Sequence, residues 1–128
     1  IDTSALIAIL TREPDALSFA EAIERDPVRS ISAGTLIECG IVVESRRGDA
    51  GGRDLDALLH RIKAEIVPVD ESQASLAREA FRTYGKGRHA ASLNFGDCFS
   101  YALAVSRGDT LLYKGNDFSY TDVRSVTM

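Results

Sequence analysis

The stretch VRSISAGTLIECGIVVESRR (residues 28–47) joins two patterns that together predict how the chain folds. Residues 28–33 have the short apolar character of a buried strand, and a helix pattern, GTLIECGIVVESRR, follows directly. Domains in which strands and helices alternate build a parallel sheet that helices cover. This stretch therefore predicts an α/β fold.

The same alternation continues on both sides of this stretch. Residues 66–69 and 110–113 are also predicted strands. Ile1 and Asp2 have the character of a strand end whose beginning is missing, so we expect the native chain to start a few residues earlier. Residues 1–128 are expected to form one domain. The other predicted helices are residues 4–10, 13–26, 52–65, 71–87 and 94–108.

The composition is that of an ordinary soluble protein, with 45% hydrophobic and 27% charged residues. The net charge of −4 argues against a protein that coats nucleic acid without sequence preference, because such proteins are basic overall. A local basic patch is still compatible with this charge. No apolar run approaches the roughly 20 residues needed to cross a bilayer, and no signal peptide is recognisable. We therefore expect a cytoplasmic protein without a membrane partner. Cys39 and Cys98 lie in apolar patterns and are expected to be reduced and buried.

Acidic residues follow the predicted strands. Ligands of parallel α/β sheets bind outside the carboxyl ends of the strands. Asp2 follows the first predicted strand, Asp70 follows residues 66–69, and Asp117 ends the sequence KGND after residues 110–113. Asp2 also has a local explanation as a helix cap, and Asp117 as a turn residue.

Glu38 and Asp97 are carboxylates in apolar helix patterns. The sequence LIECGIVV predicts a helix buried on every side, where a glutamate must be paired, protonated or bound to metal. The alternative for Glu38 is a structural salt bridge with Arg46 or Arg47. Asp97, in the stretch GDCFSYALA, has a local alternative as the third residue of a helix that Asn94 caps.

A single hard divalent cation would explain all of these acids together, because Mg²⁺ takes oxygen ligands. His60 and His89 have no metal-ligand partner four residues on, which disfavours zinc. The sequence also lacks the GxSxG elbow of serine hydrolases and the GxxxxGK[ST] phosphate loop. The candidate carboxylates are Asp2, Glu38, Asp97 and Asp117.

Four stretches together resemble one protein family. They are IDTSALIAIL, GTLIECGIVVESR, YGKGRHAASLNFGDCFSYALA and LLYKGNDFSYTDV. In this ordered set the chain resembles the PIN-domain ribonucleases, and within them the VapC-type toxins of bacterial toxin–antitoxin pairs. The resemblance implies a PIN-like three-layer sandwich, with a central parallel sheet of four to five short strands wrapped by helices. It also implies an endoribonuclease that depends on Mg²⁺ or Mn²⁺.

The resemblance implies a role for each acid. Asp2 and Asp97 match the direct metal ligands, and Glu38 matches the second acid, which orients the attacking water. Asp117 is the expected residue at the fourth position, and both the adjacent Asn116 and the nearby Asp122 compete with it for this place. The two residues expected to support this set are Ser4 and Asn116.

The resemblance also implies three partners. These are an RNA substrate, a second copy of the chain in a homodimer, and an antitoxin protein whose C-terminal segment fills the acidic pocket. In YGKGRH, Lys86 and Arg88 are candidate contacts for RNA phosphates. Solvated charges at a helix end are the alternative for these two residues.

Three rival functions make different demands on the sequence. A receiver-like phospho-acceptor domain explains Asp70 and Lys114, but it needs an acidic pair after the first strand and leaves Glu38 unexplained. A haloacid-dehalogenase-type phosphatase needs an aspartate where Ser4 stands. A PIN module that binds RNA without cutting it is the third rival, and the complete acid set argues against it.

Overall fold

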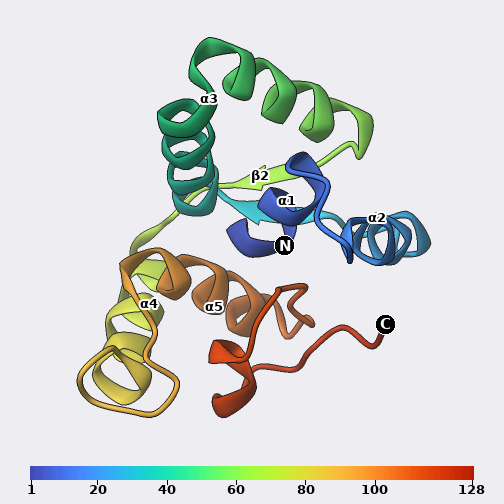
Figure 1. Cartoon of the computed structure of the whole chain (residues 1–128). Helices are drawn as coiled ribbons and strands as arrows, with labels where there is room; N and C mark the ends of the chain where they lie inside the picture. The colour runs from blue at the N-terminus through green and yellow to red at the C-terminus, as the bar shows by residue number, and fades with distance from the viewer.

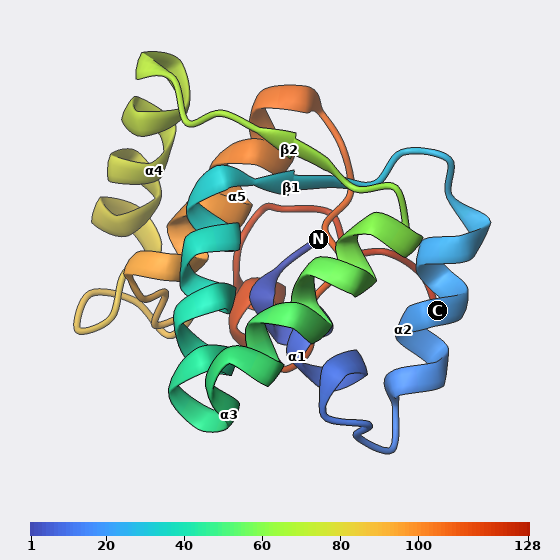
Figure 2. The ribbon, with the colours of Figure 1, turned by 90° about the horizontal axis from the view of Figure 1, so that it is seen from above.

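A computed structural model describes residues 1–128 and confirms the α/β class. Its two strands pair in parallel, with Ile31 beside Ile66. Figure 1 shows these strands between α3 above and the pair of α4 and α5 below. Helices α2 and α4 lie at opposite ends of the molecule (Figure 2). In chain order the elements are α1 (Thr3–Leu10), α2 (Ala16–Arg25), β1 (Ser30–Ser32), α3 (Ala33–Arg61), β2 (Glu65–Val67), α4 (Glu71–Tyr84), α5 (Phe95–Arg107) and the 3₁₀ turn η1 (Asp117–Tyr120).

The sheet is smaller than the four to five strands that the sequence implies, because only β1 and β2 form a ladder. Two other predicted strands lie alongside through single hydrogen bonds. Ile1 N donates to Ser30 O (2.9 Å), and Asp2 N donates to Leu112 O (2.9 Å). Only two residues precede α1 in this sequence, which is too few for a ladder. Ile1 and Asp2 thus bridge β1 and the segment around Leu112.

Helix α3 replaces two predicted helices, residues 34–47 and 52–65. Its two halves meet at Gly48, where φ is 61° and ψ is −151°, a conformation that glycine adopts most readily. A Cβ at Gly51 would overlap the carbonyl of Val43, so the absence of a side chain lets the halves fold close together. The second half ends at Arg61, earlier than predicted, because Glu65 already belongs to β2.

The first half of α3 is not buried on every side, which corrects the expectation from LIECGIVV. Ile37 is 63% exposed and Ile41 is 61% exposed. Helix α5 covers only one side of α3, where the Phe99 ring occupies the space that a Cβ at Gly34 would need. The apolar character of the other side therefore has no partner within the chain.

The core holds α1 at the centre of the molecule, packed against both α2 and α3. Ala5, Leu6 and Ala8 of α1 are completely buried. Cys39 and Cys98 are free, buried thiols, as predicted. None of the helices combines the length and the apolar character that a bilayer crossing requires.

Candidate active site

Asp2 caps α1 and accepts three hydrogen bonds. Ser4 donates to Oδ2 through its backbone N–H (3.0 Å) and its hydroxyl (2.7 Å). Ser100 of α5 donates its hydroxyl to Oδ1 (2.6 Å). Asp2 is only 3% exposed, and no basic side chain pairs with it. Asp2 therefore does cap α1, as its local explanation predicts. Capping does not require the carboxylate to be buried without a cation, however, and this burial is costly.

Glu38 is half-buried on the first half of α3 and accepts a hydrogen bond from the Thr3 hydroxyl at Oε1 (2.6 Å). The salt bridge considered for it is absent, because Arg47 pairs with Asp54 (2.6 Å) and no other basic side chain reaches Glu38. A Cβ at Gly96 would overlap the Glu38 carboxylate. This glycine therefore allows α5 to approach Glu38 closely.

Replacing Gly96 with alanine is expected to displace the Glu38 carboxylate and to lower RNA cleavage. The added methyl group overlaps only the flexible end of the Glu38 side chain, so this end must move away from the Thr3 hydroxyl while the fold changes little in stability. Gly40→Ala is the matched control, because its Cβ would meet only Glu44, at 3.8 Å. The control is expected to gain roughly 0.5–1 kcal/mol of helix stability. Urea unfolding and single-turnover RNA cleavage compare both variants, and equal cleavage by Gly96→Ala and Gly40→Ala would contradict the close contact.

Asp97 is the third residue of α5 and forms a capping box with Asn94. Asn94 N donates to Asp97 Oδ2 (3.0 Å), and Asp97 N donates to Asn94 Oδ1 (2.9 Å). Burial raises the pKa of Asp97 to about 7, although the hydrogen bond from Asn94 opposes the rise. The negative charges of Asp2, Glu38 and Asp117 raise this pKa further. The local cap is thus confirmed, and the charges of the other three predicted acids also act on Asp97.

The fourth acid lies in the segment after residue 113. Asp117 opens η1, is exposed, and contributes to the raised pKa of Asp97. Asp122 instead accepts a hydrogen bond from the Tyr101 hydroxyl (2.5 Å). Asn116 is exposed, and its side chain makes no hydrogen bond to the acids. The geometry thus favours Asp117 over Asp122 and leaves the supporting role of Asn116 a prediction.

Ser4 connects the acids to the loop after residue 113. Its hydroxyl accepts a hydrogen bond from Lys114 N (2.9 Å) while it donates to Asp2. The ammonium group of Lys114 pairs with Glu13 and Asp15. This cation is therefore engaged by the loop between α1 and α2 and does not neutralise the acids.

Lys86 and Arg88 are exposed in the loop between α4 and α5. Neither forms an ion pair, and the Arg88 guanidinium lies 5.8 Å from the centre of the Phe81 ring. Both charges are free to meet a phosphate. No contact joins them to Asp97, so their role in RNA binding stays a prediction.

The chemistry of the four acids suits a hard divalent cation. Every donor is a carboxylate, and no lysine or arginine neutralises the set. No three His, Cys, Asp or Glu side chains stand close enough to hold one ion together. Mg²⁺ is typically held by one or two protein carboxylates together with several waters, so a set of three ligating side chains is not required. Asp2 and Asp97 stay the predicted ligands.

Sequence reasoning singled out Ser4, whose hydroxyl donates to Asp2, but missed two other hydroxyl groups that hold the acids. Thr3 holds Glu38, and Ser100 holds Asp2. The only signal was position, since Thr3 directly follows Asp2 and Ser100 lies three residues after Asp97, on the same face of a helix.

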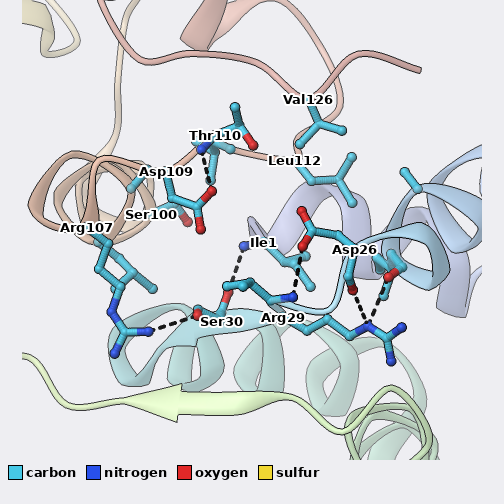
Figure 3. A pocket seen from close by; sticks show the side chains of 16 residues that line it. Ile1, Asp26, Arg29, Ser30, Ser100, Arg107, Asp109, Thr110, Leu112 and Val126 are labelled. Carbon is cyan, nitrogen blue, oxygen red and sulfur yellow. Dashed lines mark hydrogen bonds between the residues drawn. The ribbon is translucent and has the colours of Figure 1, made fainter.

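A small cavity lies beside Ile1, between β1, α2 and α5 (Figure 3). It is a cavity of about 50 Å³ with a largely apolar lining. Of the two arginines at its edge, Arg107 binds Glu65 (2.8 Å) and Arg29 donates to the Ile23 carbonyl (2.9 Å). Because both cations are already engaged within the protein, the cavity does not offer an anion site.

Comparisons with known proteins agree with this geometry. The PIN domain family model matches residues 1–124. The chain belongs to the PIN-domain family. Ribonuclease VapC of Mycolicibacterium smegmatis is 57% identical over 126 residues, which are 98% of this chain and 98% of that protein. Ribonuclease VapC30 of Mycobacterium tuberculosis is 52% identical over 128 residues, which are 100% of this chain and 98% of that protein.

A solved structure shares the fold. The crystal structure of Mycobacterium tuberculosis VapC20, a sarcin–ricin loop cleaving toxin, matches with a TM-score of 0.73 and 18% identity over 96% of each chain. The relatives with 52–57% identity are ribonucleases named VapC, which makes this PIN domain a ribonuclease of the VapC type. The receiver and phosphatase rivals are excluded. Asp70 has a structural role instead, because it caps α4 by accepting a hydrogen bond from Gln73 N (2.8 Å).

Proposed function

We propose that this ribonuclease cleaves internal phosphodiester bonds of RNA with the help of Mg²⁺ or Mn²⁺. The observation that carries the proposal is the set of carboxylates without a neutralising cation around Asp97, whose pKa is raised to about 7. Asp2 and Asp97 would hold the cation, which when bound supplies a Lewis acid for the phosphate and makes an attacking water more acidic. The Thr3 bond engages Oε1 of Glu38 and leaves Oε2 to orient that water.

The metal requirement is tested with the purified chain and a labelled RNA. Cleavage is expected in Mg²⁺ or Mn²⁺, none in excess EDTA, and recovery when Mg²⁺ is added back beyond the chelator. The RNA phosphate and the site carboxylates are all negatively charged, so a cation is needed to bring them together. No activated nucleophile of the protein accompanies the carboxylates. Full activity in excess EDTA would overturn the metal mechanism, while metal-dependent RNA binding without cleavage would support the non-catalytic alternative.

Lys86 and Arg88 are proposed to bind the RNA backbone. Replacing both with alanine is expected to weaken RNA binding several-fold and to flatten its salt dependence, while turnover of bound RNA changes little. Binding is measured by fluorescence anisotropy across a series of salt concentrations. The control is the double variant Arg46→Ala and Arg53→Ala, which removes two exposed, unpaired charges from α3. Equal RNA binding by both double variants would show that Lys86 and Arg88 are only solvated charges at a helix end.

The antitoxin is proposed to inhibit by placing a basic side chain among the acids. Such a group meets several carboxylates that no cation of this chain neutralises, and a guanidinium can pair carboxylates through two parallel hydrogen bonds. Alanine in place of that partner residue should restore cleavage in the complex. Inhibition that persists without any basic residue in the partner's tail would exclude this mode. The cytoplasm is the proposed location of the pair.

A homodimer is proposed to form through apolar side chains that the fold leaves uncovered. Ile37 and Ile41 lie one turn apart on α3, and Phe95 at the start of α5 is 78% exposed. The Phe95 ring packs against the Phe99 ring, with 5.0 Å between the ring centres, and Phe99 lies against Gly34 of α3. Ile37, Ile41 and Phe95 therefore lie beside the contact between α3 and α5. Light scattering should report a dimer that Ile37→Lys converts to a monomer. A monomeric parent chain would contradict the proposal.

A further inference from the structure

Two buried hydroxyl groups connect α3 and α5 to Asp2. Thr35 Oγ1 lies 3.0 Å from Ser100 Oγ, and Ser100 Oγ lies 2.6 Å from Asp2 Oδ1. Thr35 is 0% exposed, Ser100 is 2% exposed and Asp2 is 3% exposed. The three groups therefore interact with one another without competition from solvent.

The direction of these hydrogen bonds follows from counting protons. An ionised carboxylate can only accept, so the single hydroxyl proton of Ser100 goes to Asp2. Ser100 then has only lone pairs to offer Thr35, and Thr35 must be the donor between the two. The chain of donors runs from Thr35 through Ser100 to Asp2, and it orients the Ser100 proton toward the carboxylate.

The Asp2 carboxylate is thus held at both oxygens, by Ser4 at Oδ2 and by Ser100 at Oδ1. We infer that Ser100, oriented by Thr35, is a positioning residue that fixes the Asp2 carboxylate for a divalent cation. The inference rests on the proposed metal-dependent function. Oδ2 already accepts two hydrogen bonds from Ser4, whereas Oδ1 accepts only the bond from Ser100 and keeps a lone pair for a cation.

The experiment measures Mn²⁺ binding to the full chain without RNA, by isothermal titration calorimetry. Ser100→Ala is expected to weaken Mn²⁺ binding about tenfold or more, the range found for groups that orient metal ligands. Thr35→Val keeps the side-chain shape and should weaken binding less, because Ser100 can still donate. Ser100→Thr keeps the hydroxyl group and should therefore retain Mn²⁺ binding.

Ser106→Ala is the matched control on the same helix. Ser106 is exposed, and its hydroxyl donates only to the Leu103 carbonyl (3.1 Å), so Mn²⁺ affinity should not change. Melting of each variant in EDTA is recorded beside the titrations. A merely structural role for Ser100 lowers the melting temperature in EDTA and leaves the Mn²⁺ affinity unchanged.

The outcomes separate the inference from the function on which it rests. If Asp2→Asn weakens Mn²⁺ binding but Ser100→Ala does not, the positioning role is overturned and the metal site stands. If the parent chain binds no Mn²⁺, or binds it equally well after Asp2→Asn, both the metal site and the inference fail. If Ser100→Ala does not fold, an unchanged Mn²⁺ affinity of Thr35→Val overturns the inference, and a weakened one supports it.

Discussion

Asp2→Asn is expected to lower RNA cleavage at least about 100-fold, because even groups that only orient a metal ligand contribute 10–100-fold. The substitution removes one charge from the proposed ligand pair and keeps the size of the side chain. Asparagine caps helices as well as aspartate does, so α1 should still begin at Thr3. The measurement is single-turnover cleavage of a labelled RNA in saturating Mg²⁺.

The fold is expected to tolerate this change because the hydroxyl chain can reverse. The side-chain carbonyl of the introduced asparagine can keep the two donors of Ser4, while its amide group faces Ser100. Ser100 can then accept from the amide and donate to Thr35, since hydroxyl protons rotate. A loss of cleavage with an unchanged circular dichroism spectrum would therefore report on chemistry rather than on unfolding.

Asp70→Asn is the matched control for this prediction. Asp70 is also a helix cap, and its side chain accepts only the Gln73 N–H (2.8 Å). It does not contribute to the raised pKa of Asp97. This variant should cleave RNA as well as the parent chain. Equal activity of Asp2→Asn and Asp70→Asn would remove Asp2 from the catalytic set.

Helix positions were predictable because they depend on local signals. The pattern at residues 71–87 predicts a helix, and α4 begins after the Asp70 cap and ends before Gly85. Asn94 and Gly108 bound α5 in the same way, by a capping box and a left-handed residue. Glu38 and Asp97 could be singled out for a related reason, since a charge within an apolar pattern stands out in any sequence.

The features that were missed depend on contacts between distant parts of the chain. Ser100 lies 98 residues from Asp2 in the sequence, and nothing local distinguishes it from a serine that faces solvent. The exposure of Ile37 and Ile41 depends on which side of α3 the other helices cover. The extent of the sheet likewise depends on partner segments, and short strand patterns do not specify how many hydrogen bonds each will form.

Asp97→Asn is expected to stabilise the metal-free protein at pH 8, because the folded state holds the Asp97 carboxylate at a cost. The pKa of Asp97 is raised from 3.8 to about 7, first by burial and then by the neighbouring carboxylates. An acid whose pKa is raised by folding favours the folded state at low pH, and this contribution is lost as pH rises from about 4 to about 7. In EDTA the parent chain should therefore become less stable across this interval, and the variant should change less.

At pH 8 the free energy of unfolding of Asp97→Asn is expected to exceed that of the parent chain by about 1–2 kcal/mol. This figure includes a reduction for solvent screening, because Asp97 is only half-buried. For a domain of this size that corresponds to roughly 3–8 °C in melting temperature. The capping box should survive, because the amide oxygen of the new asparagine can still accept from Asn94 N. Asp70→Asn again serves as the control and should show no such gain.

Adding Mg²⁺ should reverse the order of the two proteins at pH 8. A cation that binds only the folded state stabilises it by mass action, so the parent chain should gain melting temperature with Mg²⁺ while Asp97→Asn gains little. A purely local role for Asp97 predicts the opposite pattern in EDTA, since loss of a favourable charge at a helix start costs roughly 0.3–1 kcal/mol. If the variant melts below the parent chain in EDTA at both pH 5 and pH 8, and Mg²⁺ moves neither protein, Asp97 acts only as a cap. At pH 8 the metal-ligand role and the capping role predict opposite changes in melting temperature for Asp97→Asn in EDTA. Melting curves of the parent chain and the variant, each in EDTA and in Mg²⁺, therefore decide between the two roles.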